Sequence, residues 1–203
     1  MGKKIAVSAV CLALALAAGL RIWAVNANAM RQQVEYYEAG VMVPLEDDFF
    51  YTETEHPEGY SVRVDGYEIK TYSDYIAGVG ETEDFYASMG SGGPGSDNVP
   101  GYVLDLQITI ANENNTEGFI YLAQYGLQYE NDLILPSSIL WFAAQKNLDG
   151  KLSFKLRENS EMTFHVPYPT NYSIERRLGN YLEDPPMYLV VSAYPVKKMI
   201  RVC

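Results

Sequence analysis

Cysteine, histidine and positive charge are scarce in this chain of 203 residues. Two cysteines cannot form a disulfide framework, and two histidines leave almost nothing for a histidine-rich metal site. Fifteen lysines and arginines face 26 aspartates and glutamates, and the formal net charge of -11 argues against a nucleic-acid binder. The sequence also has no internal repeat of the kind that marks solenoids and propellers.

Hydrophobic residues, by contrast, are plentiful. They make up 48% of the chain, against 20% charged residues, so the chain can bury a core. This composition argues against a wholly disordered chain and against a coiled-coil rod. A domain of roughly 145 residues hides about two thirds of its unfolded surface and needs no disulfide.

The start of the chain has the pattern of an export signal. Lys3 and Lys4 precede residues 5–20, an uncharged and mostly apolar run. As a helix this run spans about 24 Å, which is less than a hydrocarbon core of about 30 Å. Extension of the helix to Val25 lengthens it to about 31 Å, which is enough to span. Residues 5–25 are therefore predicted to anchor the chain in a membrane.

A cleaved signal peptide is the alternative for the same segment. Ala27-Asn28-Ala29 matches the small-x-small rule for cleavage before Met30. Residues 1–29 contain three basic and no acidic residues, so the remainder has a formal charge of -14. An anionic membrane surface repels such a domain. In both cases residues 30–203 are exported, either anchored to the cell membrane or secreted after cleavage following Ala29.

Residues 30–59 show no sustained hydrophobic period. They mix acids, aromatics and two separated prolines, as in Glu46-Asp47-Asp48-Phe49. We interpret this segment as an acidic stalk that leads into a folded domain of residues 60–203.

Beyond the stalk, apolar residues alternate with a period of two. Val62 and Val64 precede Asp65-Gly66, and Tyr67 and Ile69 follow it. Asp-Gly between alternating apolar residues is a strong signal for a tight hairpin. A two-residue loop there pairs Val64 with Tyr67 and Val62 with Ile69 on one face.

Further strands are predicted along the rest of the domain. The clearest is Tyr102–Asn112, and residues 119–129 repeat the alternation in a second long strand. Shorter strands are predicted at 152–156, 162–168, 187–193 and 196–202. Residues 133–144 are apolar on both faces and broken by Pro136, which indicates a short strand with an irregular crossing. About six to eight strands, with no amphipathic helix after the N-terminal segment, predict an all-β antiparallel sandwich preceded by one hydrophobic helix.

Motifs for catalysis are few. A nucleophilic set would need His56 or His165, and the pattern around each indicates an ordinary solvated residue. Acids cluster at 46–48, 81–84 and 183–184, but none has the spacing of a calcium loop. We therefore assign no catalytic, cofactor-binding or metal-binding residue. Paired carboxylates for glycoside hydrolysis stay open, because their separation is a three-dimensional property.

Two features are candidates for contact with a partner. The glycine-rich loop 90–101 has no phosphate-binding motif and is either a mobile connection or a binding loop. All 17 tyrosines lie beyond residue 29. Among them Tyr36-Tyr37, Tyr72 and Tyr75 are predicted as exposed contact residues.

Several short segments, spread over nearly the whole chain, form a recognisable set. They are Arg21-Ile22-Trp23 with Val25-Asn26, Tyr37-Glu38-Ala39-Gly40 through Val43-Pro44-Leu45, Gly59-Tyr60-Ser61-Val62, and Tyr194-Pro195-Val196. In these segments the chain resembles a family of uncharacterised bacterial proteins, classed as a domain of unknown function, with one N-terminal anchor. The resemblance implies Gram-positive origin, a surface location and an extracytoplasmic immunoglobulin-like β-sandwich. It transfers no active site.

The leading functional prediction is a non-enzymatic binding or accessory module of the cell envelope. It follows from the export signal, the sandwich pattern and the lack of concentrated catalytic chemistry, and its envelope partner is unidentified. One alternative is a carboxylate-based hydrolase of envelope glycans, motivated by the acid content and the location. A further alternative is an immunity or sensor protein that intercepts an extracellular peptide.

Overall fold

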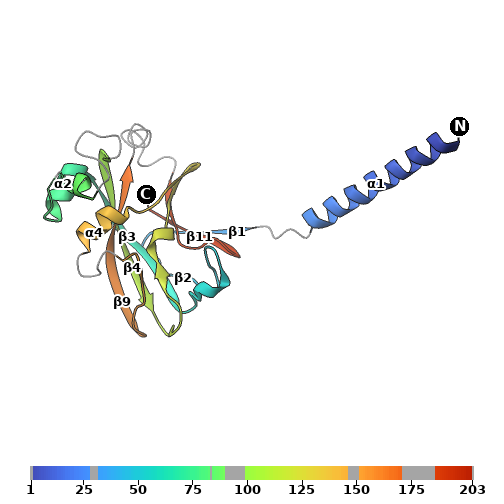
Figure 1. Cartoon of the computed structure of the whole chain (residues 1–203). Helices are drawn as coiled ribbons and strands as arrows, with labels where there is room; N and C mark the ends of the chain where they lie inside the picture. Colours follow the sequence, from blue (N-terminus) through green and yellow to red (C-terminus); the bar gives the residue numbers. More distant parts are fainter. Residues whose placement is uncertain are drawn as a thin grey trace. The chain divides into compact units, whose positions relative to one another are not determined.

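The computed structural model describes residues 2–27, 32–82, 84–89, 99–145, 151–170 and 186–202. The chain divides into two compact units, Met1–Gln32 and Gln33–Cys203. The first contains helix α1 (Gly2–Ala27), and the second contains the strands (Figure 1). Within the described ranges, no helix is both long enough and apolar enough to cross a membrane.

Three sequence predictions fall largely on residues outside these ranges. The glycine-rich loop predicted at 90–101 is described only from residue 99 onward. The cleavage motif at 27–29 is described only at Ala27, and the acid pair at 183–184 lies wholly outside. The structure therefore does not test these three predictions.

The larger sheet contains five strands in the order β1-β11-β10-β6-β7. Their bounds are β1 (Gln33–Tyr37), β11 (Val196–Arg201), β10 (Met187–Val190), β6 (Leu127–Tyr129) and β7 (Asp132–Ile134). Neighbours are antiparallel except for β1 and β11, which are parallel. That parallel pair brings the two ends of the domain together.

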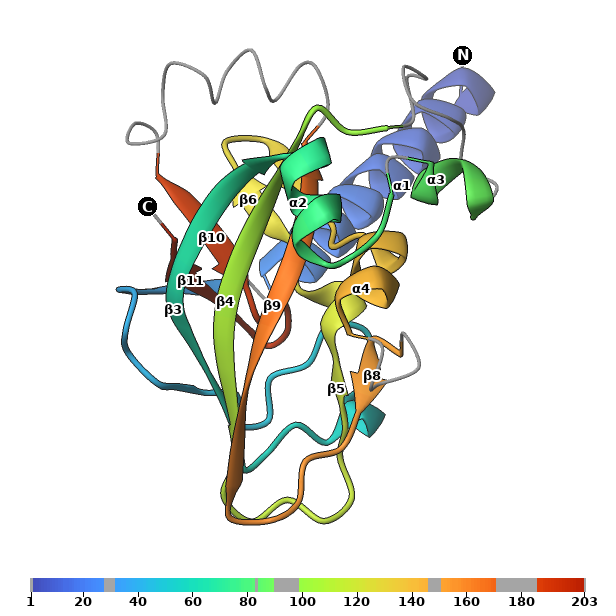
Figure 2. The same ribbon diagram turned by 90° about the vertical axis from the view of Figure 1, so that its left-hand side faces the viewer.

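The second sheet contains four antiparallel strands in the order β2-β3-β4-β9. Its long strands lie side by side and curve together in Figure 2. The bounds are β2 (Val43–Pro44), β3 (Tyr60–Thr71), β4 (Tyr102–Asn112) and β9 (Ser160–Thr170). A separate antiparallel pair joins β5 (Ile120–Tyr121) to β8 (Ser153–Phe154).

One apolar cluster contains the inward side chains of both main sheets. Alternate residues of β4, from Leu104 to Ile110, are buried as the period predicts. They belong to one cluster with Leu127, Leu189 and Ile200 of the larger sheet. Each such side chain contributes about 1.5–3 kcal/mol when buried. The fold is thus mostly β with several antiparallel sheets, as the alternation predicted.

Short helices add a second, smaller cluster. They are α2 (Tyr72–Gly78), α3 (Phe85–Ser88) and α4 (Ser138–Ala144), with 3₁₀ turns η1 (Glu53–Glu55) and η2 (Leu122–Gln124). Ile76 and Leu140 pack in one cluster with Val103, which points out of β4 on the side opposite the main core. The expectation of no amphipathic helix after the N-terminal segment missed these three, because helices of seven residues or fewer show no sustained 3.6-residue period.

The hairpin predicted at Asp65-Gly66 is wrong. Strand β3 runs straight through this dipeptide, and its register against β4 shifts by one residue between Val64 and Gly66. The extra residue of a bulge moves every later side chain to the opposite face of the strand. Tyr67 therefore lies on the same core side as Val64, although the two are three positions apart. A two-residue hairpin loop produces the same phase change in the sequence, which is why alternation alone could not separate them.

The second long strand predicted at 119–129 is also wrong. It is divided into β5, the 3₁₀ turn η2 and β6. The turn shifts the phase, so that Ile120 and Leu122 are buried while Phe119 and Tyr121 are exposed. Period-two counting missed this phase shift because it assumed an unbroken strand. The adjoining prediction at 133–144 likewise becomes β7 followed by α4.

The acidic stalk predicted at 30–59 is corrected from Gln33 onward. Residues 33–37 form β1 and pair with β11, and Val43 and Leu45 lie in the main core. The folded unit therefore begins at Gln33 instead of Tyr60. A five-residue strand that pairs with the far end of the chain leaves no local hydrophobic period to detect.

Candidate ligand-binding groove

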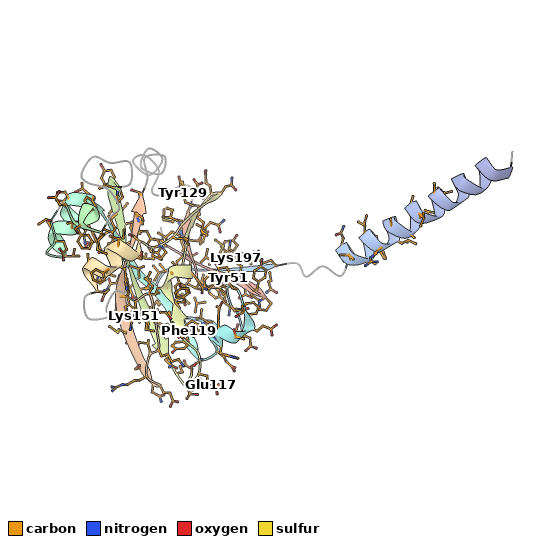
Figure 3. All side chains as sticks on the ribbon, in the orientation of Figure 1. Tyr51, Glu117, Phe119, Tyr129, Lys151 and Lys197 are labelled. Atoms are coloured by element: carbon orange, nitrogen blue, oxygen red, sulfur yellow. The ribbon has the colours of Figure 1, made fainter. Side chains whose placement is uncertain are left out.

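A groove of about 630 Å³ lies between three segments of the folded unit. Its lining comes from residues 47–58, from the turn at 114–117 and from Pro195. A second hollow of about 260 Å³ shares Asp47, Glu58 and Asn114 with it, so the two hollows are adjacent. Glu117, labelled in Figure 3, lies on the turn that follows β4.

The lining of the groove is acidic. Asp47, Glu53, Glu58 and Glu117 line the larger hollow, and all four side chains are exposed. The smaller hollow adds two further acids, Glu46 and Glu113. No lysine or arginine occurs among the described residues that line either hollow. Carboxylates on one concave surface produce a negative potential that attracts cations.

Phe49 and Pro57 give the groove an apolar part. The Phe49 main chain bridges to Tyr194: its N–H donates to the Tyr194 carbonyl at 2.6 Å, and its carbonyl accepts from the Tyr194 N–H at 2.8 Å. The two rings lie 6.4 Å apart. This bridge joins the 47–58 segment to Pro195, the lining residue from the other end of the domain.

Asn115 joins two sides of the groove. Its side-chain Nδ2 donates to the main-chain carbonyls of His56, at 2.7 Å, and Glu58. Its Oδ1 accepts from the N–H groups of Glu117, at 3.0 Å, and Gly118, at 2.6 Å. One amide side chain therefore uses both of its polar atoms to hold the 114–117 turn against the 56–58 segment.

Two glycines permit this close approach. A Cβ atom at Gly118 would meet the His56 carbonyl oxygen at 1.8 Å, and one at Gly59 would meet the Asn114 side chain at 2.3 Å. Gly59 also has a positive φ of 86°, a conformation that favours glycine. The groove thus depends on residues without side chains at both contact points.

Glu55 organises the segment that carries Glu53. Its carboxylate accepts the main-chain N–H groups of Phe50 at 3.0 Å, Tyr51 at 2.9 Å and Thr52 at 3.3 Å. Glu55 is the last residue of η1, and its carboxylate reaches back to main-chain donors that precede the turn, as in a capping box. Glu55 therefore has a structural role, and Glu53 is left to face the groove.

The structure places the two histidines differently. His56 lines the groove with an exposed side chain and a positive φ of 46°. His165 points outward from β9, as predicted, but its Nδ1 lies 3.3 Å from Asp105 Oδ2, which Lys70 also contacts at 3.1 Å. The two histidines therefore do not share a site, and sequence reasoning missed the place of His56 because it lay in the assumed stalk.

The predicted contact tyrosines are only partly exposed. Tyr36 is exposed and stacks edge-on against Tyr188, with ring centroids 5.1 Å apart. Tyr37 packs against the main core. Tyr72 and Tyr75 are buried in the smaller cluster, so their prediction as exposed contacts is wrong. Their helix α2 turns them toward Val103 instead of toward solvent.

The acid cluster at 46–48 separates into different roles. Asp47 lines both hollows, whereas Asp48 is buried. In the described part of the chain, no group of three or more histidines, cysteines or acids has a geometry that could hold a metal ion. What distinguishes the groove chemically is therefore its exposed negative charge beside an aromatic ring.

The fold and the groove together define a mostly β domain with an open acidic groove. The chain belongs to the family described as Domain of unknown function (DUF5028), whose model matches residues 34–198. This match coincides with the folded unit that starts at Gln33, and it confirms the predicted membership in a family of unknown function. No curated protein and no solved structure matches the chain.

Proposed function

We propose that this protein is an extracytoplasmic, non-enzymatic binding module of the cell envelope whose groove takes a cationic ligand. The observation that supports this function is the lining of about 630 Å³ of groove by four exposed acids, without a lysine or arginine among its described residues. Phe49 adds a ring against which the stem of a lysine or arginine side chain can pack. A short basic segment of a peptide or protein combines these properties.

The charge of the groove favours capture of such a ligand. Exposed charges attract over about 8 Å at physiological salt and farther at low salt. The exported part of the chain has a formal charge of -14, so the long-range field has the same sign as the groove. Association with a basic segment is therefore accelerated by the whole domain and made specific by the groove.

The extracytoplasmic location rests on the export signal in residues 1–29. The retained form would be anchored through residues 5–25, and the processed form would begin at Met30. The immunoglobulin-like sandwich and the Gram-positive origin, which the family resemblance implies, belong to the same proposal. Mass spectrometry of the protein from cell membranes and from the medium tests this location and the state of the N-terminus. An intact N-terminus in the cytosolic fraction would contradict it.

Interception of an extracellular peptide is a second role that the same groove supports, because a basic peptide fits an acidic lining. Hydrolysis of envelope glycans is less well supported. A glycosidase needs one carboxylic acid whose surroundings keep it protonated near neutral pH, usually an apolar pocket. The four acids of the groove are all exposed to solvent instead. Failure to release sugar from purified cell wall would agree with this assessment.

The proposed site is tested with a tetralysine peptide as the probe. One variant of the full chain neutralises the four acids of the groove, with the changes Asp47→Asn, Glu53→Gln, Glu58→Gln and Glu117→Gln. Exposed pairs contribute about 0.5 kcal/mol each, so the variant should lose about 2 kcal/mol, or roughly thirtyfold in affinity. Isothermal titration calorimetry at about 20 mM and about 150 mM salt measures the loss and its screening.

A matched control neutralises four acids that do not line the groove. The changes are Asp84→Asn, Glu130→Gln, Glu158→Gln and Glu161→Gln. Both variants lose the same formal charge, so any long-range effect of net charge is the same in both. Because its four acids do not line the groove, the control should keep the affinity of the unaltered chain within about threefold. Equal losses in both variants, or no binding by the unaltered chain, would exclude the groove as a cation site.

A further inference from the structure

Lys198 is a charged residue inside the domain. Its side chain is 1% exposed, and it lies on the same side of β11 as Ile200, a member of the main core. Its neighbour Lys197, labelled in Figure 3, alternates to the other face of the strand and is only partly buried. Two consecutive lysines therefore have different surroundings, which makes one a natural control for the other.

The Lys198 ammonium contacts oxygen atoms of a single short segment. Its Nζ donates to the Pro44 carbonyl at 2.7 Å and to Glu46 Oε2 at 2.5 Å. Asp48 Oδ2 lies 2.8 Å away as an ion pair, and the Leu45 carbonyl lies at 3.4 Å. These contacts of the ammonium all come from residues 44–48, which run from the end of β2 to the groove.

A buried ammonium requires such partners. Removing a charge from water costs several kcal/mol unless other charges and hydrogen bonds replace the solvent. Burial lowers the pKa of Lys198, but hydrogen bonds and charge interactions with Asp48 and Glu46 outweigh it, and the pKa lies above its ordinary value. Lys198 is therefore charged at neutral pH, and its neutralisation depends on the position of residues 44–48.

The same segment leads directly into the groove. Asp47 lies between the two acids that contact Lys198, and Phe49 follows them. Asp48 also accepts the Val196 N–H at 2.9 Å through its other oxygen. The ammonium thus contacts Glu46 and Asp48, and Asp47 between them lines both hollows, while Glu46 stays exposed and lines the smaller one.

We propose that Lys198 is the positioning residue of the acidic groove: it holds residues 44–48 against β11 and so presents Asp47 and Phe49 to the ligand. This inference rests on the proposed function of the groove. It also explains why three consecutive acids can occur beside a binding surface. Two of them have the internal cation as a partner, and Asp47, which lines both hollows, faces the ligand.

The test compares Lys198→Met with Lys197→Met in the full chain. Tetralysine affinity is measured by calorimetry, and main-chain hydrogen exchange is measured at Phe49 and Val196, with Leu106 of β4 as a reference. In Lys198→Met we expect affinity to fall about tenfold, equivalent to about 1.4 kcal/mol, and exchange at Phe49 and Val196 to accelerate while exchange at Leu106 stays slow. Lys197→Met should match the unaltered chain in both measurements.

Several outcomes overturn the inference. Unchanged affinity with unchanged exchange at Phe49 and Val196 in Lys198→Met excludes a positioning role, and acceleration that extends equally to Leu106 indicates a general loss of stability instead. If Lys198→Met does not fold, Asp48→Asn removes the charged partner with little change of shape and is expected to give the same local acceleration. If the unaltered chain does not bind tetralysine, the proposed function fails, and exchange alone decides whether Lys198 positions the segment.

Discussion

Replacing Asn115 with alanine is the sharpest structural perturbation of the groove. The side chain makes four hydrogen bonds, two as a donor to the 56–58 segment and two as an acceptor from the turn that ends at Gly118. The Asn115→Ala variant removes all four and leaves the main chain of both segments without these partners. The neighbouring Asn114 lines the groove with an exposed side chain and supplies the matched control, Asn114→Ala.

The magnitude follows from the exposure of the partners. A net hydrogen bond contributes about 0.5–1.5 kcal/mol, and bonds at the surface belong at the lower end because water replaces them. Four bonds at about 0.5 kcal/mol each predict a loss of about 2 kcal/mol of unfolding free energy. For a domain of this size that loss corresponds to a decrease of roughly 4–8 °C in Tm.

Urea unfolding followed by circular dichroism measures this loss in the full chain. The midpoint should shift without a change in slope, because the surface exposed on unfolding stays the same. Asn114→Ala should stay within about 0.5 kcal/mol of the unaltered chain. An Asn115→Ala loss below about 0.5 kcal/mol, or one equal to that of the control, would refute the assignment of Asn115 as the connection between the two segments.

Two further predictions concern stability and pH. Gly118→Ala places a Cβ 1.8 Å from the His56 carbonyl oxygen, so we expect the free energy of unfolding to fall by more than about 2 kcal/mol. Gly66 has open space around it, so Gly66→Ala should lower the free energy of unfolding by less than about 1 kcal/mol. Equal losses in urea unfolding would contradict this prediction. The Tyr37 hydroxyl donates to Glu35 at 2.6 Å, and this bond, with burial, raises the pKa of Tyr37 to about 12. Because the folded pKa is the higher one, the stabilisation is complete below pH 10 and is lost as the pH rises through 12. Absorbance titration should show this group ionising earlier in Glu35→Gln, and an unchanged titration would exclude the assigned cause.

Much of the β structure could be predicted from the sequence. The alternation in Tyr102–Asn112 predicted both the strand and its buried face, because residues two apart must share a side of a sheet. The prediction for 162–168 lies within β9, where Phe164, Val166 and Tyr168 are buried. These strands are long, and each pairs along its whole length, so local pattern and tertiary pairing agree.

The groove could not be predicted in the same way. Asn115 lies in a polar turn, and nothing in the sequence indicates that its amide reaches the carbonyls of His56 and Glu58. The acid run at Glu46-Asp47-Asp48 was visible as charge, but its internal partner, Lys198, is about 150 positions away and follows another lysine in the sequence. A surface built from non-local contacts leaves no period along the chain.

The sequence by itself determined the charge balance, the basic and then apolar pattern of the first residues, the predominance of strands and the inward residues of the long ones. Each of these depends on composition or on neighbours within a few positions. Tertiary structure decided that residues 33–59 belong to the folded unit, that Asp65-Gly66 is a bulge and that Asp47 faces a groove while Asp48 does not. Those outcomes depend on which distant strand supplies the partner, and only the folded chain brings such partners within hydrogen-bonding distance.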